Sequence, residues 1–217
     1  MGYESLYSDK STSYYSESRE DILPFVPSNI GIALDIGCGN GSFGKMLKEK
    51  FDCEVWGVEP DKESATLAGE KIDKVISSVF DGNLDFQGQK FDCIFFNDVL
   101  EHLVEPSVAI LSAKKLLKSD GCIISSIPNI LHFFTIWKIL ETQDWRYEDA
   151  GIMDKTHLRF FTRKSIVRMF EKCGLKIDDI QGINPTYGKK YHLLNALFLN
   201  KIKDMKYIQF VVTVTFA

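Results

Sequence analysis

The sequence lacks several features that would have pointed to a particular class of protein. It has no CxxC pair and no spacing typical of a metal site, and none of its apolar runs reaches the roughly 18 residues that a membrane span requires. Its first residues are polar and show no h-region of a secretory signal. We therefore expect no metal ion, no transmembrane segment and a cytoplasmic location.

The chain also has no excess of basic residues, since 26 Lys and Arg stand against 30 Asp and Glu for a formal charge of −4. This weak acidity argues against the broad basic surface of a nucleic-acid-binding protein, so we expect neither DNA nor RNA as a substrate. Repeats, low-complexity tracts and clear interdomain linkers are missing as well. With 217 residues, 45% of them hydrophobic, the sequence predicts a single domain over residues 1–217 with a core of useful size.

Cysteine is scarce and odd in number. The five cysteines are scattered over positions 38, 53, 93, 122 and 173. All but the first fall in or near predicted strands and helices, where we expect them to act as small apolar fillers.

Segments of strand type and helix type alternate along the chain. Predicted strands cover 32–36, 54–58, 74–78, 91–97, 122–127, 175–180 and 207–215, and predicted helices cover 44–50, 63–71, 106–117 and 164–172. Repeated βα units indicate a mainly parallel sheet that is covered on both faces. The predicted fold class is therefore α/β, a doubly wound, Rossmann-like sheet of seven strands.

A glycine-rich turn follows the first predicted strand. Asp35 ends this strand, and Gly37, Gly39 and Gly41 follow at alternate positions before a helix begins. Such a strand-to-helix turn is where doubly wound sheets bind ligands, and glycines let the backbone take positive φ and approach the ligand closely. A second acid, Glu59, ends the next strand, where it could accept both hydroxyls of a ribose. The pattern predicts a pocket for a nucleoside cofactor.

Two cofactors fit this outline, because Gly39, Gly41 and Gly44 also satisfy the dinucleotide pattern GxGxxG. A dinucleotide would bring its pyrophosphate to the N-terminus of the helix, close to the carboxylate of Asp35, which would repel it. S-adenosylmethionine instead brings an ammonium and a sulfonium, which an acid attracts. Asp35 therefore favours S-adenosylmethionine, with S-adenosylhomocysteine as the product, over a NAD-type cofactor.

Three segments resemble the class I S-adenosylmethionine-dependent methyltransferases. Residues 35–41 (DIGCGNG) are similar to motif I of this family, residues 57–61 (GVEPD) to its ribose-binding strand end, and residues 91–103 to its fourth strand and following turn. The resemblance implies an antiparallel last strand, formed here by 208–215. It also implies that Cys38, Pro60 and Asn97 join the cofactor site.

The polar and aromatic segment 1–28 is expected to cover the cofactor, because such a stretch often does so in relatives of this family. By this resemblance Tyr15 and Arg19 could close on the methionine moiety, and the guanidinium of Arg19 suits its carboxylate. A tail that leads into a surface helix is the alternative.

One position departs from the family pattern. Many relatives carry an acid just after the third strand that accepts a hydrogen bond from the adenine amino group, whereas this chain has Val79 there. Either Asp81 replaces that acid with a shifted loop, or the adenine stacks against Phe80 and is held by backbone groups.

The connection 128–163, between the fifth and sixth strands, is long and is expected to form a helical cap on the acceptor side. Its apolar helix over 130–140 is interpreted as a lid, although a membrane-surface or partner-binding element would have a similar pattern. Residues 145–162 resemble a subgroup of these methyltransferases associated with surface polysaccharide and sugar modification. Leu193 to Leu199 form a second apolar stretch that could serve a homodimer contact as readily as a core helix.

The same connection supplies the candidate catalytic residues. A histidine that is supported by a carboxylate can take a hydroxyl proton near neutral pH, so His157 is the predicted general base. Asp154 is predicted to orient His157 or to bind a hydroxyl group of the acceptor. Arg159 is predicted to anchor a carboxylate or phosphate of the acceptor. Each of the three could have a purely structural role, and His102 and His132 compete for the role of base.

The sequence thus predicts an S-adenosylmethionine-dependent O-methyltransferase that acts on a small-molecule acceptor, a sugar or sugar-derived compound such as a nucleotide sugar or glycan precursor. A methyltransferase of a quinone-like or lipid precursor is the alternative enzyme. A non-catalytic cofactor-binding subunit of a glycan assembly complex is the alternative of another class. The choice between an oxygen and a nitrogen nucleophile stays open.

Overall fold

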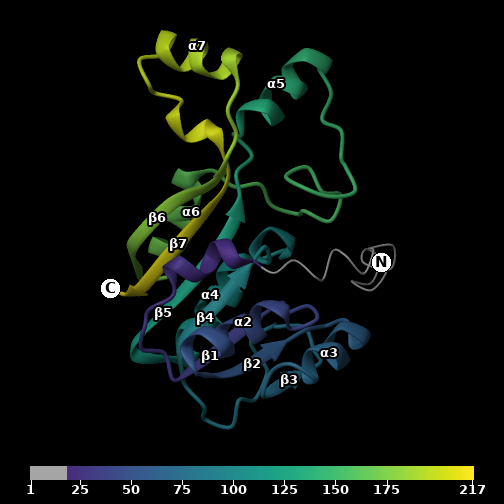
Figure 1. The fold of residues 1–217 in the computed structure, drawn as a ribbon, viewed down its shortest axis with the longest axis vertical. Helices are drawn as coiled ribbons and strands as arrows, with labels where there is room; N and C mark the ends of the chain where they lie inside the picture. Colours follow the sequence, from purple (N-terminus) through teal and green to yellow (C-terminus); the bar gives the residue numbers. More distant parts are fainter. Residues whose placement is uncertain (1–18) are drawn as a thin grey trace.

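The computed structural model describes residues 19–217 and shows a seven-stranded sheet with helices on both faces (Figure 1). The strands are β1 (Ile32–Ile36), β2 (Glu54–Val58), β3 (Lys74–Ile76), β4 (Phe91–Asn97), β5 (Leu117–Pro128), β6 (Leu175–Pro185) and β7 (Tyr207–Phe216). The helices are η2 (Glu20–Phe25), α2 (Ser42–Phe51), α3 (Lys62–Gly69), η3 (Leu100–His102), α4 (Pro106–Leu116), α5 (Phe133–Thr142), α6 (Arg163–Lys172), α7 (Lys189–Leu197) and η4 (Lys203–Lys206).

The strand order is β3-β2-β1-β4-β5-β7-β6, and only β7 runs antiparallel to its neighbours. This confirms the predicted fold class, including the antiparallel last strand. From β1 the chain builds outward to β2 and β3, and then crosses back to place β4 on the other side of β1. The direction in which successive strands are added to the sheet therefore reverses between β1 and β4. This is where ligands bind in doubly wound sheets.

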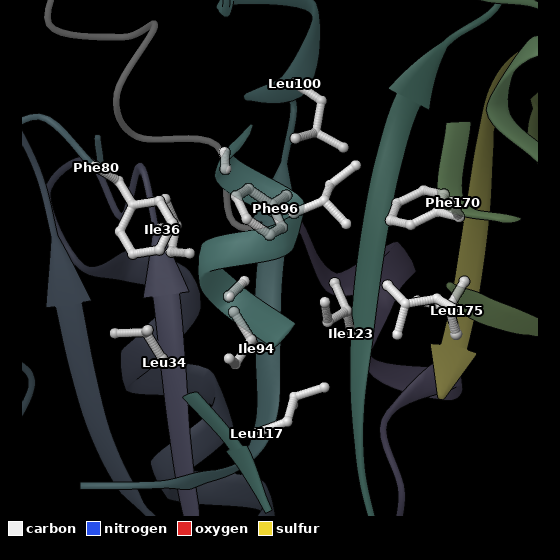
Figure 2. Packing of buried hydrophobic residues seen from close by; sticks show 14 of the residues in the cluster. Leu34, Ile36, Phe80, Ile94, Phe96, Leu100, Leu117, Ile123, Phe170 and Leu175 are labelled. Atoms are coloured by element: carbon white, nitrogen blue, oxygen red, sulfur yellow. The ribbon is translucent and has the colours of Figure 1, made fainter. Parts of the chain in front are cut away.

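Two apolar layers hold the helices against the sheet. Side chains alternate along β4, so that Ile94 and Phe96 face one layer while Cys93 and Phe95 face the other. Figure 2 shows the first layer, in which Phe96 and Ile123 lie in the cluster that Phe170 of α6 joins. Helices α4 and α6 cover this face, and η2, α2 and α3 cover the opposite one.

All five cysteines are buried and free, and the four predicted as apolar fillers, Cys53, Cys93, Cys122 and Cys173, belong to the core. Cys93 and Cys122 sit opposite each other on β4 and β5 with their sulfur atoms 3.5 Å apart. Burial raises the pKa of Cys38 well above its ordinary value, and the carboxyl groups of Asp35 and Glu59 raise it further. Cys38 is thus buried at the edge of the cavity that its turn helps to line.

Helices α5 and α7 lie together beyond the C-terminal end of β5, away from the helices that cover the sheet (Figure 1). The ring of Phe133 meets Tyr191 at 5.5 Å between centroids, and the Lys190 ammonium lies 4.6 Å from the ring centroid of Trp137. The predicted helix over 130–140 begins later, at Phe133, because the Asn129 side chain accepts a hydrogen bond from the next turn and holds the chain in a bend. None of the helices within residues 19–217 is long and apolar enough to cross a bilayer.

Candidate active site

A cavity of about 850 Å³ opens at the C-terminal ends of β1, β2 and β4. Residues from the turn after β1, the turn after β2, the end of β4 and the connection after α5 line it together. Arg19, directly before η2, and Phe80, after β3, line the cavity as well. The sequence-predicted site residues in the lining are Arg19, Asp35, Gly37, Cys38, Gly39, Glu59, Pro60, Phe80, Asn97, Asp154 and His157. Asp98, Glu101, His102 and Gln209 line it as well.

The glycine turn needs glycine for two separate reasons. Gly37, Gly39 and Gly41 have φ values of 73°, 52° and 75°, a region that side-chain-bearing residues rarely adopt. A Cβ atom on Gly37 would also lie 2.6 Å from a methyl group of Val99, and one on Gly41 would lie 2.9 Å from the backbone of Ala68. Gly41 caps the N-terminus of α2 and is outside the cavity lining, so it shapes the turn from behind.

Glu59 fixes the glycine turn against the end of β2. One oxygen of its buried carboxylate accepts a hydrogen bond from the Gly39 N–H at 2.9 Å, and the other accepts from the Asp61 N–H at 2.9 Å. Burial raises the pKa of Glu59, although these two N–H groups oppose the shift. The acid therefore organises the backbone that surrounds the cavity while one of its edges still lines it.

Asp35 is an acid in an unfavourable place for a negative charge. Its side chain is buried, and burial together with the nearby Glu59 carboxylate raises its pKa to about 8, with only partial compensation by Arg19. Such a group gains most from a cation that enters the cavity. The ammonium and sulfonium of S-adenosylmethionine fit this requirement.

Asn97, at the end of β4, gives an independent test of the cofactor's fit. Its amide nitrogen and its amide oxygen are shielded from solvent, and neither has a hydrogen-bond partner within the described residues. A buried amide without partners is costly, so a ligand that both donates and accepts hydrogen bonds suits this wall of the cavity. The residues that surround the cavity thus fit a nucleoside cofactor with a charged amino acid moiety.

Of the two arrangements predicted for the adenine, the cavity lining agrees with the one that uses Phe80 and not with the one that uses Asp81. Phe80 is buried, lines the cavity and packs edge-to-face on Phe96 at 6.1 Å between centroids. Asp81 is exposed outside the lining, and its carboxylate accepts hydrogen bonds from the Asn83 backbone and side chain, which lower its pKa. The local turn at Asn83 holds Asp81 away from the cavity, so the alternative with Phe80 and backbone groups stays as the proposal.

Arg19 reaches the cavity from the N-terminal side, while Tyr15 lies outside the described residues. The Arg19 guanidinium pairs with the Asp98 carboxylate and donates to the Gln209 side chain at 3.3 Å. Gln209 in turn donates to Asp98 at 2.7 Å. This network ties the start of η2 to the end of β4 and the beginning of β7. Sequence reasoning missed Asp98 and Gln209 because the link joins segments that are far apart in the chain.

On the acceptor side, a carboxylate and two imidazoles come together. Glu101 and His102 belong to η3, directly after β4, and His157 comes from the connection between α5 and α6. His157 Nε2 lies 3.9 Å from Glu101 Oε1, and the two imidazole rings meet at 4.7 Å between centroids. Burial raises the pKa of Glu101 to about 8. The carboxylate of Glu101 therefore lies beside His157.

Asp154 lines the cavity with His157, whereas Arg159 does not line it. The Asp154 carboxylate accepts from the backbone N–H and hydroxyl of Thr156 at 2.8 and 2.7 Å, so it closes the turn that leads to His157. The Arg159 guanidinium is outside the cavity lining, where it donates to the Val104 carbonyl at 3.0 Å. The Arg159 side chain, which we expected to anchor an anion of the acceptor, is thus hydrogen-bonded to the backbone of an exposed loop.

His132 does not compete for the role of base, because it lies away from the cavity. Its ring contacts the hydroxyls of Thr135 and Thr186 at 3.2 and 2.6 Å, and burial lowers its pKa. Helix α5 likewise contributes no residue to the described lining of the cavity. The residues of this connection that line the cavity come from the segment Ala150 to His157. The part of the connection that faces the cavity therefore follows α5.

A family model described as a methyltransferase domain matches residues 12–180. An uncharacterized protein of Methanocaldococcus jannaschii is 30% identical over 171 residues, which cover 77% of this chain and 75% of that protein. A ubiquinone biosynthesis O-methyltransferase of Neisseria meningitidis serogroup A is 22% identical over 185 residues, which cover 76% of this chain and 69% of that protein.

Solved structures show the same fold. A SAM-dependent methyltransferase of Archaeoglobus fulgidus superposes with a TM-score of 0.65 at 15% identity, covering 98% of this chain and 99% of that one. A plantazolicin methyltransferase in complex with S-adenosylhomocysteine gives a TM-score of 0.67 at 14% identity, covering 99% and 93%. Together with the glycine turn, the buried acids and the open amide of Asn97, these matches show that the chain belongs to the methyltransferase-domain family and is a class I S-adenosylmethionine-dependent methyltransferase.

Proposed function

We propose that the protein methylates a hydroxyl group of a hydroxylated aromatic acceptor of the quinone-precursor type. The observation that carries the proposal is the buried group formed by Glu101, His102 and His157, which lines the same cavity as the glycine turn. S-adenosylmethionine, when bound, supplies an electrophilic methyl group on sulfur. A hydroxyl must lose its proton as it takes that methyl group, and imidazole can accept a proton near neutral pH.

The His157 ring is held in one tautomer for this task. Its Nδ1 lies 3.0 Å from the Ile152 carbonyl oxygen, which can only accept a hydrogen bond. The neutral ring therefore carries its hydrogen on Nδ1 and its lone pair on Nε2, on the side of Glu101. We take this group as the place where the acceptor hydroxyl is received, while Asp35, Glu59, Phe80 and Asn97 hold the cofactor.

Two observations favour an apolar, aromatic acceptor. Several relatives at 21–28% identity are named ubiquinone biosynthesis O-methyltransferases, and the chain spans 65–74% of their length. In addition, large apolar side chains are exposed on α5, α7 and the turns beside them, where a tail could lie. They are Leu131, Phe134, Leu140, Leu193, Leu197, Phe198 and Leu199, with exposures of 42–79%. The relatives named above give no support to the sugar acceptor that the subgroup resemblance suggested.

The test is a methyl-transfer assay with labelled S-adenosylmethionine. The full chain is incubated with catechols and demethylated quinone precursors, with and without an isoprenoid tail, and in parallel with a panel of nucleotide sugars. We expect label in the extracted aromatic product, and more of it when the tail is present. Label confined to the nucleotide sugars would overturn the aromatic acceptor in favour of the sugar.

Two variants make the assay specific to the site. His157→Gln should lose most of the methylation while it keeps its affinity for S-adenosylhomocysteine, because His157 lies on the acceptor side. His132→Gln is the matched control, since both histidines are 7% exposed but His132 lies outside the cavity lining. Equal activities of the two variants would contradict the placement of the acceptor at His157.

A further inference from the structure

The three buried groups on the acceptor side have the composition of a metal site. One ligand atom from each of Glu101, His102 and His157 lies within 4.8 Å of the others, and the three residues are 1%, 6% and 7% exposed. Both carboxylate oxygens of Glu101 are buried and have no hydrogen-bond partner within the described residues. A buried carboxylate without hydrogen bonds costs several kcal/mol unless a proton or a cation neutralises it.

The imidazoles are oriented as metal-binding histidines usually are. His102 Nδ1 lies 3.2 Å from the Thr156 carbonyl oxygen, and His157 Nδ1 lies 3.0 Å from that of Ile152. Because carbonyl oxygens only accept hydrogen bonds, both Nδ1 atoms carry hydrogen, and in the neutral rings both Nε2 atoms carry the lone pair. A backbone carbonyl that fixes the second ring nitrogen is a common support of histidine ligands.

Backbone hydrogen bonds hold the two contributing segments together. The N–H groups of Leu158 and Arg159 both donate to the Glu101 carbonyl, at 2.9 and 3.0 Å. The segment that carries His157 is thereby fastened to η3, which carries the other two groups. The cluster is therefore positioned by the fold and does not depend on flexible surface side chains.

From these observations we propose that Glu101, His102 and His157 bind a divalent transition-metal ion such as Zn²⁺, Mn²⁺, Fe²⁺ or Co²⁺. Two imidazoles and one carboxylate suit these ions better than Mg²⁺ or Ca²⁺, which prefer oxygen ligands. At metal–ligand distances of about 2.0–2.2 Å, neighbouring ligand atoms stand roughly 3 to 3.5 Å apart, so ligand atoms that are now up to 4.8 Å apart would have to move closer by about 1–2 Å when the ion binds.

The role of the ion rests on the proposed O-methylation. An ion held by these three residues would have coordination positions left for an oxygen of the acceptor, and it would lower the pKa of a hydroxyl group bound there. The O–H bond then breaks with its proton released to water. The oxygen forms a bond to the methyl carbon as the carbon–sulfur bond breaks. The electron pair of the broken carbon–sulfur bond stays on the sulfur, which gives neutral S-adenosylhomocysteine. In the metal-bound protein the imidazoles act as ligands, so the role of base passes from His157 to water.

Metal binding is tested first, without any acceptor. The full chain is stripped with a chelator and titrated with Co²⁺ alone, by calorimetry and by visible absorption. We expect one Co²⁺ per chain with the visible bands of nitrogen and oxygen ligands and without the near-ultraviolet band of thiolate ligation. Glu101→Gln and His157→Gln should each weaken binding at least tenfold, while His132→Gln should bind like the unmodified chain.

Failure of binding and failure of the proposed function give different results. Equal Co²⁺ affinity in Glu101→Gln and the unmodified chain, or no binding at millimolar Co²⁺, overturns the metal site. Circular dichroism of each variant shows whether it is folded, and Glu101→Asp, which keeps the carboxylate, should restore part of the affinity. Site-dependent binding without methylation of any hydroxylated aromatic overturns the proposed function and supports the metal site. Full methylation by the stripped chain overturns the metal's role in the reaction.

Discussion

Asp35→Asn is expected to stabilise the protein and to weaken its binding of cofactor. Burial raises the pKa of Asp35 to about 8 from the ordinary 3.8, so the folded chain holds a proton that the unfolded chain has lost. At pH 7, about three units above the ordinary value, this difference costs about 4 kcal/mol at 1.36 kcal/mol per unit. Asp35→Asn removes this cost, but burial of the neutral amide in its place destabilises the folded variant by about 1–2 kcal/mol.

The net gain of about 2–3 kcal/mol should raise the melting temperature by roughly 5–10 °C for a chain of this size. The sign of the pH dependence is specific. Since the folded pKa of Asp35 is raised, its contribution to stability is lost as pH rises from about 4 to about 8. The stability of Asp35→Asn relative to the unmodified chain should therefore grow over this range, which denaturant titrations at several pH values measure.

The same variant should bind S-adenosylhomocysteine about ten- to a hundredfold more weakly, because a charge-assisted hydrogen bond to its ammonium is worth about 1.5–3 kcal/mol. Calorimetry in buffers of different ionisation enthalpy should show that the unmodified chain releases a proton on binding below pH 8, and that the variant does not. A stability difference that stays constant from pH 4 to 8, or an unchanged affinity, would refute the reasoning.

Asp92→Asn is the matched control with the opposite sign. Partial burial of Asp92 would raise its pKa, but the Lys118 ammonium and the N–H groups of Ile32 and Gly31 outweigh burial and lower it. Asp92 thus stabilises the fold above its unfolded pKa, and this contribution is lost as pH falls through the folded value. Asp92→Asn should therefore destabilise the protein at pH 7 and leave cofactor affinity unchanged.

Three further predictions concern the walls of the site. Gly37→Ala should lower the free energy of unfolding by about 1–3 kcal/mol, because its Cβ would meet Val99. Gly88 has a similar φ but open space around it, so Gly88→Ala should lower the melting temperature less than Gly37→Ala in thermal unfolding. Asn97→Ala should weaken S-adenosylhomocysteine binding about three- to tenfold at little cost in stability; unchanged calorimetric affinity would place the cofactor elsewhere. Arg159→Ala should change kcat/KM by less than about twofold, as expected for a surface group, and a loss above tenfold would show that Arg159 meets the acceptor.

The sheet could be predicted because its signals are local. The predicted strand over 91–97 agrees with β4 at both ends, and the glycine turn lies where the pattern placed it. Strand β6 extends beyond its predicted end at residue 180 to Pro185. The reason is a tertiary contact, since Gly182 leaves room for the Tyr207 ring of the neighbouring strand, which a Cβ would meet at 2.1 Å.

The acceptor side could be predicted only in part, because its groups are far apart in the chain. His157 was found from its sequence context, but its neighbour Glu101 stands 56 positions earlier and meets it only once η3 packs against the connection after α5. The same limit applies to metal sites, since spacing rules detect only ligands that are close in sequence and therefore do not consider the group that we propose as a metal site. Arg159 is predicted to bind an anion of the acceptor from its charge and sequence context. In the structure its guanidinium instead donates a hydrogen bond to the Val104 carbonyl.

The division of the cavity between two parts of the chain has a consequence for how such proteins diversify. The proposed cofactor wall consists of the ends of β1, β2 and β4, whereas the segment from Ala150 to His157 would add the acceptor wall. The carbonyls of Ile152 and Thr156 in this segment orient the two imidazoles. Exchange of that short segment between relatives would therefore alter substrate preference without disturbing the methyl donor's place. In evolutionary terms the sheet is the constant part, and new specificity can be acquired by grafting a single loop.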